Sequence, residues 1–213
     1  MRSRHAFLLT FVVLCQVLSA CAHREPPAER ATSLQQAAAV LEGESKVSVR
    51  EFSSRDFGRE KYTDAISVLV DEEDAEDVLR RVRNRLGIGL ISFIGTTRSL
   101  TEPPAEGVEV VVASGASQFD ILRVAASDAV NYDLQTEDLI PYLEKWDRAY
   151  GIDIFQAETD TIQFRLKTLP ADLKAFAEEL YQFCPDIVDQ GAGSVEALEE
   201  EIRRSRSVSL WWD

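Results

Sequence analysis

The segment from Cys184 to Gly191 holds the densest group of side chains suited to chemistry: a thiol, two carboxylates and an amide. The segment contains Pro185 and ends at Gly191, which is typical of loops that carry functional groups on a rigid scaffold. Asp186 and Asp189, together with Asp133 and Asp213, would offer calcium or magnesium the oxygen ligands that these ions prefer. The competing interpretation is that each aspartate caps a helix, closes a turn or pairs with an arginine. Because no spacing here matches a calcium-binding loop, the sequence favours the second interpretation.

Cys184 is a poor candidate nucleophile because no histidine lies nearby in the chain to act as its base. The two histidines are His5 and His23, which fall in a leader and a tether described below. Cys184 also follows Leu180 by four residues on the apolar stripe of a predicted helix, where a free thiol packs as a small hydrophobe. We therefore predict a buried core thiol. The same shortage of histidine argues against Ser–His catalysis and a tetrahedral zinc site.

A second candidate site is Gly95-Thr96-Thr97-Arg98, which directly follows a predicted buried strand. Ligands of open α/β sheets gather at the carboxyl ends of strands, and two hydroxyls with a guanidinium suit a small anion. Thr96, Thr97 and Arg98 are therefore a candidate anion site. The segment lacks the phosphate-loop pattern, so a plain connecting loop is the competing interpretation.

The elements that position these groups begin with a predicted βαβ unit. Ile66, Val68 and Val70 alternate as in a strand, and Asp71 precedes a stretch with apolar residues at helical spacing that ends at Gly87. A short, mostly apolar run over 88–94 predicts a buried second strand. We expect the two strands to run parallel with a right-handed connection. The other elements expected in this half are a helix over 33–41 ended by Gly43, and strands over 47–52 and 108–113.

The second half predicts a turn or helix over 118–129, three further helices, a hairpin and a final strand. The first of the three helices begins at Thr136 and ends at Gly151, and the others begin at Pro170 and after Ser194. Runs over 152–156 and 161–166 alternate in opposite phase, as expected for a hairpin. In the final strand, over 207–212, Trp212 shares the apolar face, which leaves Trp211 as a candidate partner surface.

The N-terminal residues predict a cellular address. Arg2 and Arg4 precede an apolar run over 6–18 that is short for a membrane span, and small residues then lead to Cys21. This order resembles the bacterial lipoprotein signal, in which the Cys21 thiol is acylated before cleavage after Ala20. Residues 1–20 would then be removed, residues 21–32 would form a flexible tether, and the lipid would hold the protein on a membrane. The alternative is an ordinary signal peptide or an uncleaved anchor.

Charge and cysteine usage exclude further classes of function. The chain has a formal net charge of −14, and removal of residues 1–20 would make it more negative still. Coulomb repulsion opposes binding to nucleic acid or to anionic lipid headgroups. Once Cys15 is removed and Cys21 is modified, Cys184 has no partner for an intrachain disulfide.

In lipoprotein signals of this type, Ala22 after the modified cysteine favours the outer membrane over the inner one.

Several stretches of the second half read together as one signature. They are Ile121-Leu122-Arg123, Val130 to Leu134, Thr136 to Ile140, Trp146, Tyr150-Gly151, Phe183 to Gly191, and Leu210-Trp211-Trp212-Asp213. The signature resembles a bacterial family known only as domain of unknown function 4253. The resemblance delimits a domain and implies no activity, cofactor or catalytic residue.

These observations predict an α+β fold in which a mixed β-sheet is packed with helices. We expect an α/β subdomain over 33–115 and an α+β domain over 116–213. The leading hypothesis is a lipid-anchored protein of the bacterial cell envelope that binds an envelope protein or a small ligand without catalysis and without a cofactor. The alternatives are a metal-dependent hydrolase that uses Asp186 and Asp189 with calcium or magnesium, and a small-anion binder. Convergence of the four aspartates in one pocket would favour the hydrolase.

Overall fold

The computed structural model describes residues 30–52, 64–95 and 107–213. The predicted leader, Cys21, most of the tether and the candidate anion site Thr96 to Arg98 lie outside these ranges. Within them, no helix is both long enough and apolar enough to cross a membrane.

The described residues form a seven-stranded sheet in the order β1-β2-β4-β3-β5-β6-β7, with helices on both faces. The strands are β1 (Arg50–Glu51), β2 (Ala65–Val70), β3 (Leu90–Gly95), β4 (Val108–Ser114), β5 (Ile152–Ala157), β6 (Thr161–Leu166) and β7 (Ser207–Trp211). The helices are α1 (Leu34–Ser45), α2 (Glu72–Arg85), α3 (Asp120–Ala125), α4 (Thr136–Tyr150), α5 (Leu173–Phe183) and α6 (Val195–Ser205). A 3₁₀ turn, η2 (Val130–Tyr132), and a π-helical turn, η3 (Ile187–Ala192), complete the fold.

The predicted α+β class is confirmed, because the sheet mixes antiparallel and parallel pairs. All neighbouring strands are antiparallel except β3 and β5, whose ladder consists of the pair Ile94 and Gln156. In the βαβ unit, β2 and β3 run in the same direction because both are antiparallel to β4. However, β4 lies between them, so the two strands of the unit are not neighbours.

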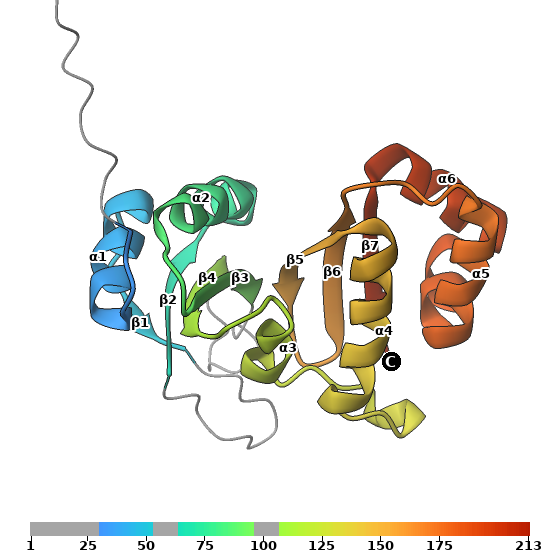
Figure 1. Cartoon of the computed structure of the whole chain (residues 1–213), viewed down its shortest axis with the longest axis horizontal. Helices are drawn as coiled ribbons and strands as arrows, with labels where there is room; N and C mark the ends of the chain where they lie inside the picture. Colours follow the sequence, from blue (N-terminus) through green and yellow to red (C-terminus); the bar gives the residue numbers. More distant parts are fainter. Residues whose placement is uncertain (1–29, 53–63, 96–106) are drawn as a thin grey trace, which may run out of the picture.

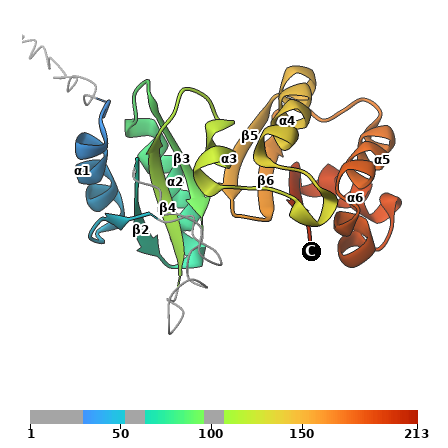
Figure 2. The ribbon, with the colours of Figure 1, turned by 90° about the horizontal axis from the view of Figure 1, so that it is seen from below.

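Two hydrophobic clusters lie on opposite faces of the sheet, since alternate residues of a strand point to opposite sides. On β4, Val110 and Val112 join the cluster of α1 and α2, whereas Val111 and Ala113 join the cluster of α3, α4, α5 and α6. Figures 1 and 2 show the resulting arrangement, with α1 at one end of the sheet and α5 and α6 at the other.

Trp146 of α4 is the centre of the larger cluster and is fully buried. Its ring stacks on Phe164 at a centroid distance of 5.7 Å, and it meets Phe176 and Phe183 edge-on at 5.9 and 5.4 Å. Its indole N–H donates to Glu179 of α5 at 2.6 Å, so the polar edge of the ring is satisfied. Trp146 therefore joins α4 and α5 to β6.

Several element boundaries differ from those expected from the sequence. Helix α1 continues through Gly43 to Ser45, because its left-handed C-cap is Lys46, with φ of 62°. Ile88, expected at the start of a buried strand, lies in a turn before β3 and is 96 % exposed. Helix α5 begins at Leu173 rather than at Pro170, since the side chain of Asp172 accepts the Ala175 N–H and caps it.

Candidate functional site

Asp186, the central residue of the predicted carboxylate site, is a buried hydrogen-bond acceptor. Its Oδ2 accepts from the Tyr132 hydroxyl at 2.9 Å and from the Asp213 backbone N–H at 3.0 Å, and its Oδ1 accepts from Gln190 at 3.1 Å. Burial alone would raise the pKa of this carboxyl, but the three donors favour its charged form and hold the pKa below its usual value. Asp186 is therefore an ionised carboxylate shared between three segments of the chain.

Cys184 is the buried thiol that the sequence predicts. Its Sγ donates to the backbone carbonyl of Trp211 at 2.9 Å. Burial raises the pKa of the thiol to about 11, although hydrogen bonds from the backbone partly oppose the rise. The thiolate is the reactive form of cysteine, so at neutral pH this side chain is an inert part of the core.

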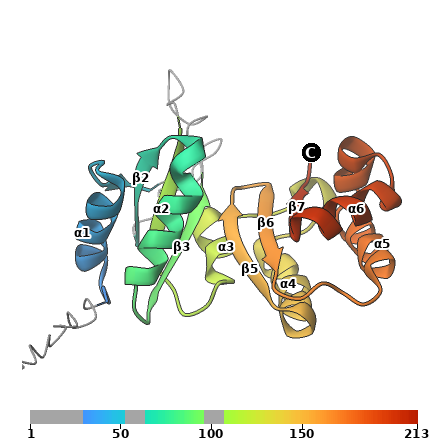
Figure 3. The same cartoon turned by 90° about the horizontal axis from the view of Figure 1, so that it is seen from above.

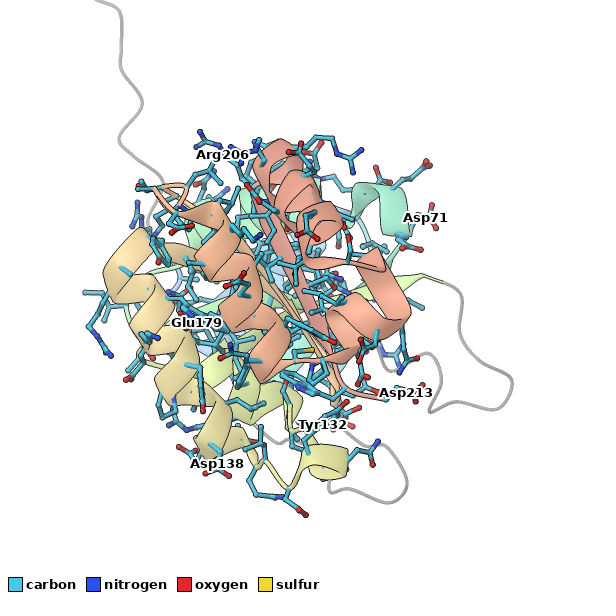
Figure 4. All side chains as sticks on the ribbon, turned by 90° about the vertical axis from the view of Figure 1, so that its right-hand side faces the viewer. Asp71, Tyr132, Asp138, Glu179, Arg206 and Asp213 are labelled. Atoms are coloured by element: carbon cyan, nitrogen blue, oxygen red, sulfur yellow. The ribbon has the colours of Figure 1, made fainter. Side chains whose placement is uncertain are left out.

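Cys184 and Asp186 belong to a set of contacts that fastens the segment Trp211–Asp213 to the end of α5. A further contact joins the Trp212 indole to Phe183, whose carbonyl accepts at 3.4 Å and whose ring meets the indole edge-on at 5.5 Å. We call these contacts, made by Phe183, Cys184 and Asp186 with Trp211, Trp212 and Asp213, the C-terminal clasp. Figure 4 shows Asp213 and Tyr132 at this side of the molecule.

The other candidate aspartates do not form a metal centre with Asp186. Asp189 is exposed and accepts from the Tyr181 hydroxyl at 2.9 Å, and Asp133 occupies a left-handed position after η2, with φ of 58°. Asp213 is exposed and contributes its backbone N–H to the clasp. Across the described ranges, no three His, Cys, Asp or Glu side chains are placed to hold a metal ion. The calcium or magnesium interpretation therefore gains no support from this geometry.

Trp211, the candidate partner surface, is partly buried against η3. A Cβ placed on Gly191 would lie 2.5 Å from Cη2 of Trp211, so the indole packs directly on the glycine backbone. Trp212 is buried in the larger core cluster, as expected. Part of the Trp211 ring is thus committed to packing within the protein.

A charged cleft that no sequence motif marks lies between α2 and the hairpin of β5 and β6. Its volume is about 430 Å³. Figure 3 shows α2 beside these two strands. The lining residues are Glu76, Asp77, Leu79, Arg80, Arg83 and Asn84 from α2, Asp153 from β5 and Arg165 from β6.

Arg83 forms the inner wall of this cleft. Its Nε and Nη2 donate to the Ser92 carbonyl at 3.0 and 2.8 Å, and Nη2 also donates to the Ile154 carbonyl at 2.6 Å. Its Nη1 donates to Asp153 at 2.8 Å. Burial lowers the pKa of Arg83, and the neighbouring Asp153 opposes that effect. One guanidinium thus links β3 to β5, beside their single ladder pair.

Gln118 makes side-chain hydrogen bonds to the backbone of β5 near the same junction. Its side-chain amide donates to the Ile152 carbonyl at 3.3 Å and accepts from the Ile154 N–H at 3.0 Å, as a neighbouring strand would. A smaller cavity, of about 280 Å³, lies between Gln118 and the Arg83–Asp153 pair. The junction of β3 and β5 is therefore completed by side chains.

The outer part of the charged cleft consists of exchangeable ion pairs. Arg165 contacts Glu76 at 2.6 Å, and its guanidinium lies 3.9 Å from the centroid of the Phe155 ring. Arg80 contacts Asp77 at 2.9 Å, with both side chains about two-thirds exposed. Such exposed pairs contribute little net free energy, so their members can take other partners at small cost.

The structure defines an α+β fold in which Phe183–Asp186 contacts Trp211–Asp213. A charged cleft lies between α2 and the hairpin of β5 and β6. Residues 109–213 match the family described as domain of unknown function (DUF4253), so the chain carries a DUF4253 domain. The match begins within β4, which leaves α2 and β3 outside it. No curated protein and no solved structure matches the chain.

Proposed function

We propose that the protein is a lipid-anchored component of the bacterial cell envelope whose folded part binds a small ligand without catalysing a reaction. The observation that carries the binding role is the cleft of about 430 Å³ beside α2, whose size suits a small molecule and whose lining consists mainly of charged side chains of both signs. The thiol and the carboxylate with the strongest catalytic appearance, Cys184 and Asp186, serve the C-terminal clasp instead.

The order of residues around Cys21 supports the anchor. A basic head, a short apolar run and small residues precede the cysteine, and about ten residues then separate Cys21 from the start of the folded part. At that start, the Ala31 N–H donates to the Arg85 carbonyl at 2.8 Å and the Gly87 N–H donates to Ala31 at 2.7 Å. A tether of this length would hold the folded part close to the membrane surface.

Replacing the acylated cysteine tests the anchor. We expect Cys21→Ser to abolish incorporation of labelled fatty acid and to release the protein from the membrane fraction, because only the thiol can take the thioether-linked lipid. Cys184→Ser is the matched control and should keep the label, since that thiol is buried. Equal labelling of wild type and Cys21→Ser would overturn the lipoprotein assignment.

A further inference from the structure

We infer that the cleft beside α2 binds a small zwitterion, such as a free amino acid or a short peptide, through one carboxylate and one amino group. The inference rests on the proposed binding function and names its ligand class. In this arrangement Arg165 and Arg80 receive the carboxylate, and Glu76 and Asp77 receive the amino group. All four side chains line the cleft.

The balance of charge in the cleft favours a zwitterion over a simple anion or cation. Three guanidiniums face three carboxylates there, in a chain whose formal net charge is −14. A simple anion on Arg165 would displace Glu76 and leave that carboxylate with water in place of its arginine partner. A cation on Glu76 would likewise displace Arg165 from its carboxylate partner. The zwitterion opens the two internal ion pairs of the outer cleft and offers a carboxylate to both arginines and an amino group to both acids, so no charge loses its partner.

The pairs differ in how readily they open. Glu76 and Arg165 have side chains that are 61 % and 39 % exposed, so water compensates when they separate. Arg165 also keeps its place over Phe155 after Glu76 moves, because the ring contact is independent of the ion pair. Arg83 is held by two backbone carbonyls as well as by Asp153, and it stays as a fixed wall.

Titration calorimetry on the purified full chain tests the ligand class. The probe is L-alanyl-L-alanine, and the matched probes are its N-acetyl derivative, which lacks the amino group, and its C-terminal amide, which lacks the carboxylate. We expect the unmodified dipeptide to bind about fivefold more tightly than either derivative, the effect of one lost ion pair at a half-exposed site. Equal affinity for the three probes, or no binding of the dipeptide at millimolar concentration, would overturn the inference.

Two variants locate the binding within the cleft. Arg165→Gln should weaken dipeptide binding about fivefold but should not weaken binding of the amide, and Glu76→Gln should weaken dipeptide binding about fivefold but should not weaken binding of the N-acetyl derivative, because each change also removes the internal partner that the probe must displace. Arg148→Gln is the matched control, because Arg148 pairs with Glu144 on the exposed side of α4. Loss of dipeptide binding in this control, or its retention in both cleft variants, would contradict the assignment.

Inorganic phosphate separates failure of the ligand class from failure of the binding role. If phosphate binds in a manner that depends on Arg165 and the dipeptide does not bind, the zwitterion assignment is wrong and the cleft still binds a ligand. If neither probe binds, the result counts against both the ligand class and the proposed binding function.

Discussion

At the scale of single residues, the groups with the strongest chemical appearance are used to hold the chain together. Asp186 accepts hydrogen bonds from Tyr132, from the Asp213 backbone and from Gln190 of its own turn. The Cys184 thiol donates a hydrogen bond to the Trp211 carbonyl. A buried carboxylate with its donors in place has little capacity left for a metal ion. The Phe183–Asp186 and Trp211–Asp213 segments of this chain therefore have a structural role in contacting each other.

The pKa of Asp186 predicts how the stability of the protein depends on pH. Because the folded-state pKa lies below the unfolded value, the charged carboxylate stabilises the fold above that unfolded value, and the contribution is lost as the pH falls through the folded pKa. We expect Asp186→Asn to lower the free energy of unfolding by about 1–3 kcal/mol at pH 7. The NH₂ group of asparagine would face the hydrogen-bond donors of Tyr132, Gln190 and Asp213, which need an acceptor. Urea denaturation at pH 7 and again at about pH 3, below the usual pKa of aspartate, measures the difference.

The gap between wild type and Asp186→Asn should be narrower at the acidic pH, because the carboxyl of the unfolded chain takes up a proton there and the stabilising contribution of the folded-state charge declines. Asp189→Asn is the control, because Asp189 is exposed and has one hydrogen bond, to Tyr181. A gap of the same size at both pH values would show that the charge of Asp186 contributes nothing.

Residue roles could be predicted from the sequence where they depend on local spacing. Cys184 follows Leu180 by one helical turn, which is sufficient to predict its burial. Arg83 could not be found in this way, because its backbone acceptors, Ser92 and Ile154, lie 9 and 71 positions along the chain. The charged cleft was missed for the same reason, since Arg165 joins α2 only after the sheet has formed.

At the scale of elements, periodicity identified the helices and strands, while their ends and their order in the sheet depended on tertiary contacts. The alternation of Ile66, Val68 and Val70 was sufficient to predict β2. Nothing local indicates that β4 lies between β2 and β3, because strand order depends on pairing between distant segments. Gly43 shows the limit of local signals, since a glycine within a helix is tolerated at about 1 kcal/mol.

Gly43 and Gly191 should respond in opposite ways to replacement by alanine. Gly43→Ala should raise the free energy of unfolding by about 0.5–1 kcal/mol, because Gly43 lies within α1 and a Cβ there meets no atom within 4 Å. Gly191→Ala should lower it by about 1–3 kcal/mol, because the new methyl group would collide with the Trp211 ring. Chemical denaturation of the two variants measures both effects. Stabilisation by Gly191→Ala would contradict the packing of Trp211 on η3.

At the scale of the whole molecule, the two halves of the sheet share the larger hydrophobic cluster, although their strands meet at a single parallel ladder pair. Phe93 and Val111, from before the predicted boundary at residue 115, belong to the same cluster as Trp146. Arg83 and Gln118 supply side-chain hydrogen bonds at the junction. The family match also crosses that boundary, since it begins within β4. These contacts predict that both halves unfold together.

Arg83→Met tests this coupling. We expect the free energy of unfolding to fall by about 3 kcal/mol, because the Ser92 and Ile154 carbonyls lose their donor and Asp153 loses its partner.

All three tryptophans lie in the second half, so their fluorescence reports that half alone, whereas far-ultraviolet circular dichroism reports both. In wild type and variant the two signals should give coincident denaturation curves. Arg80→Met, which removes an exposed arginine of the same helix, should change the midpoint little. An unchanged midpoint for Arg83→Met would show that the guanidinium does not join the halves, and separate curves in the wild type would show that they unfold independently.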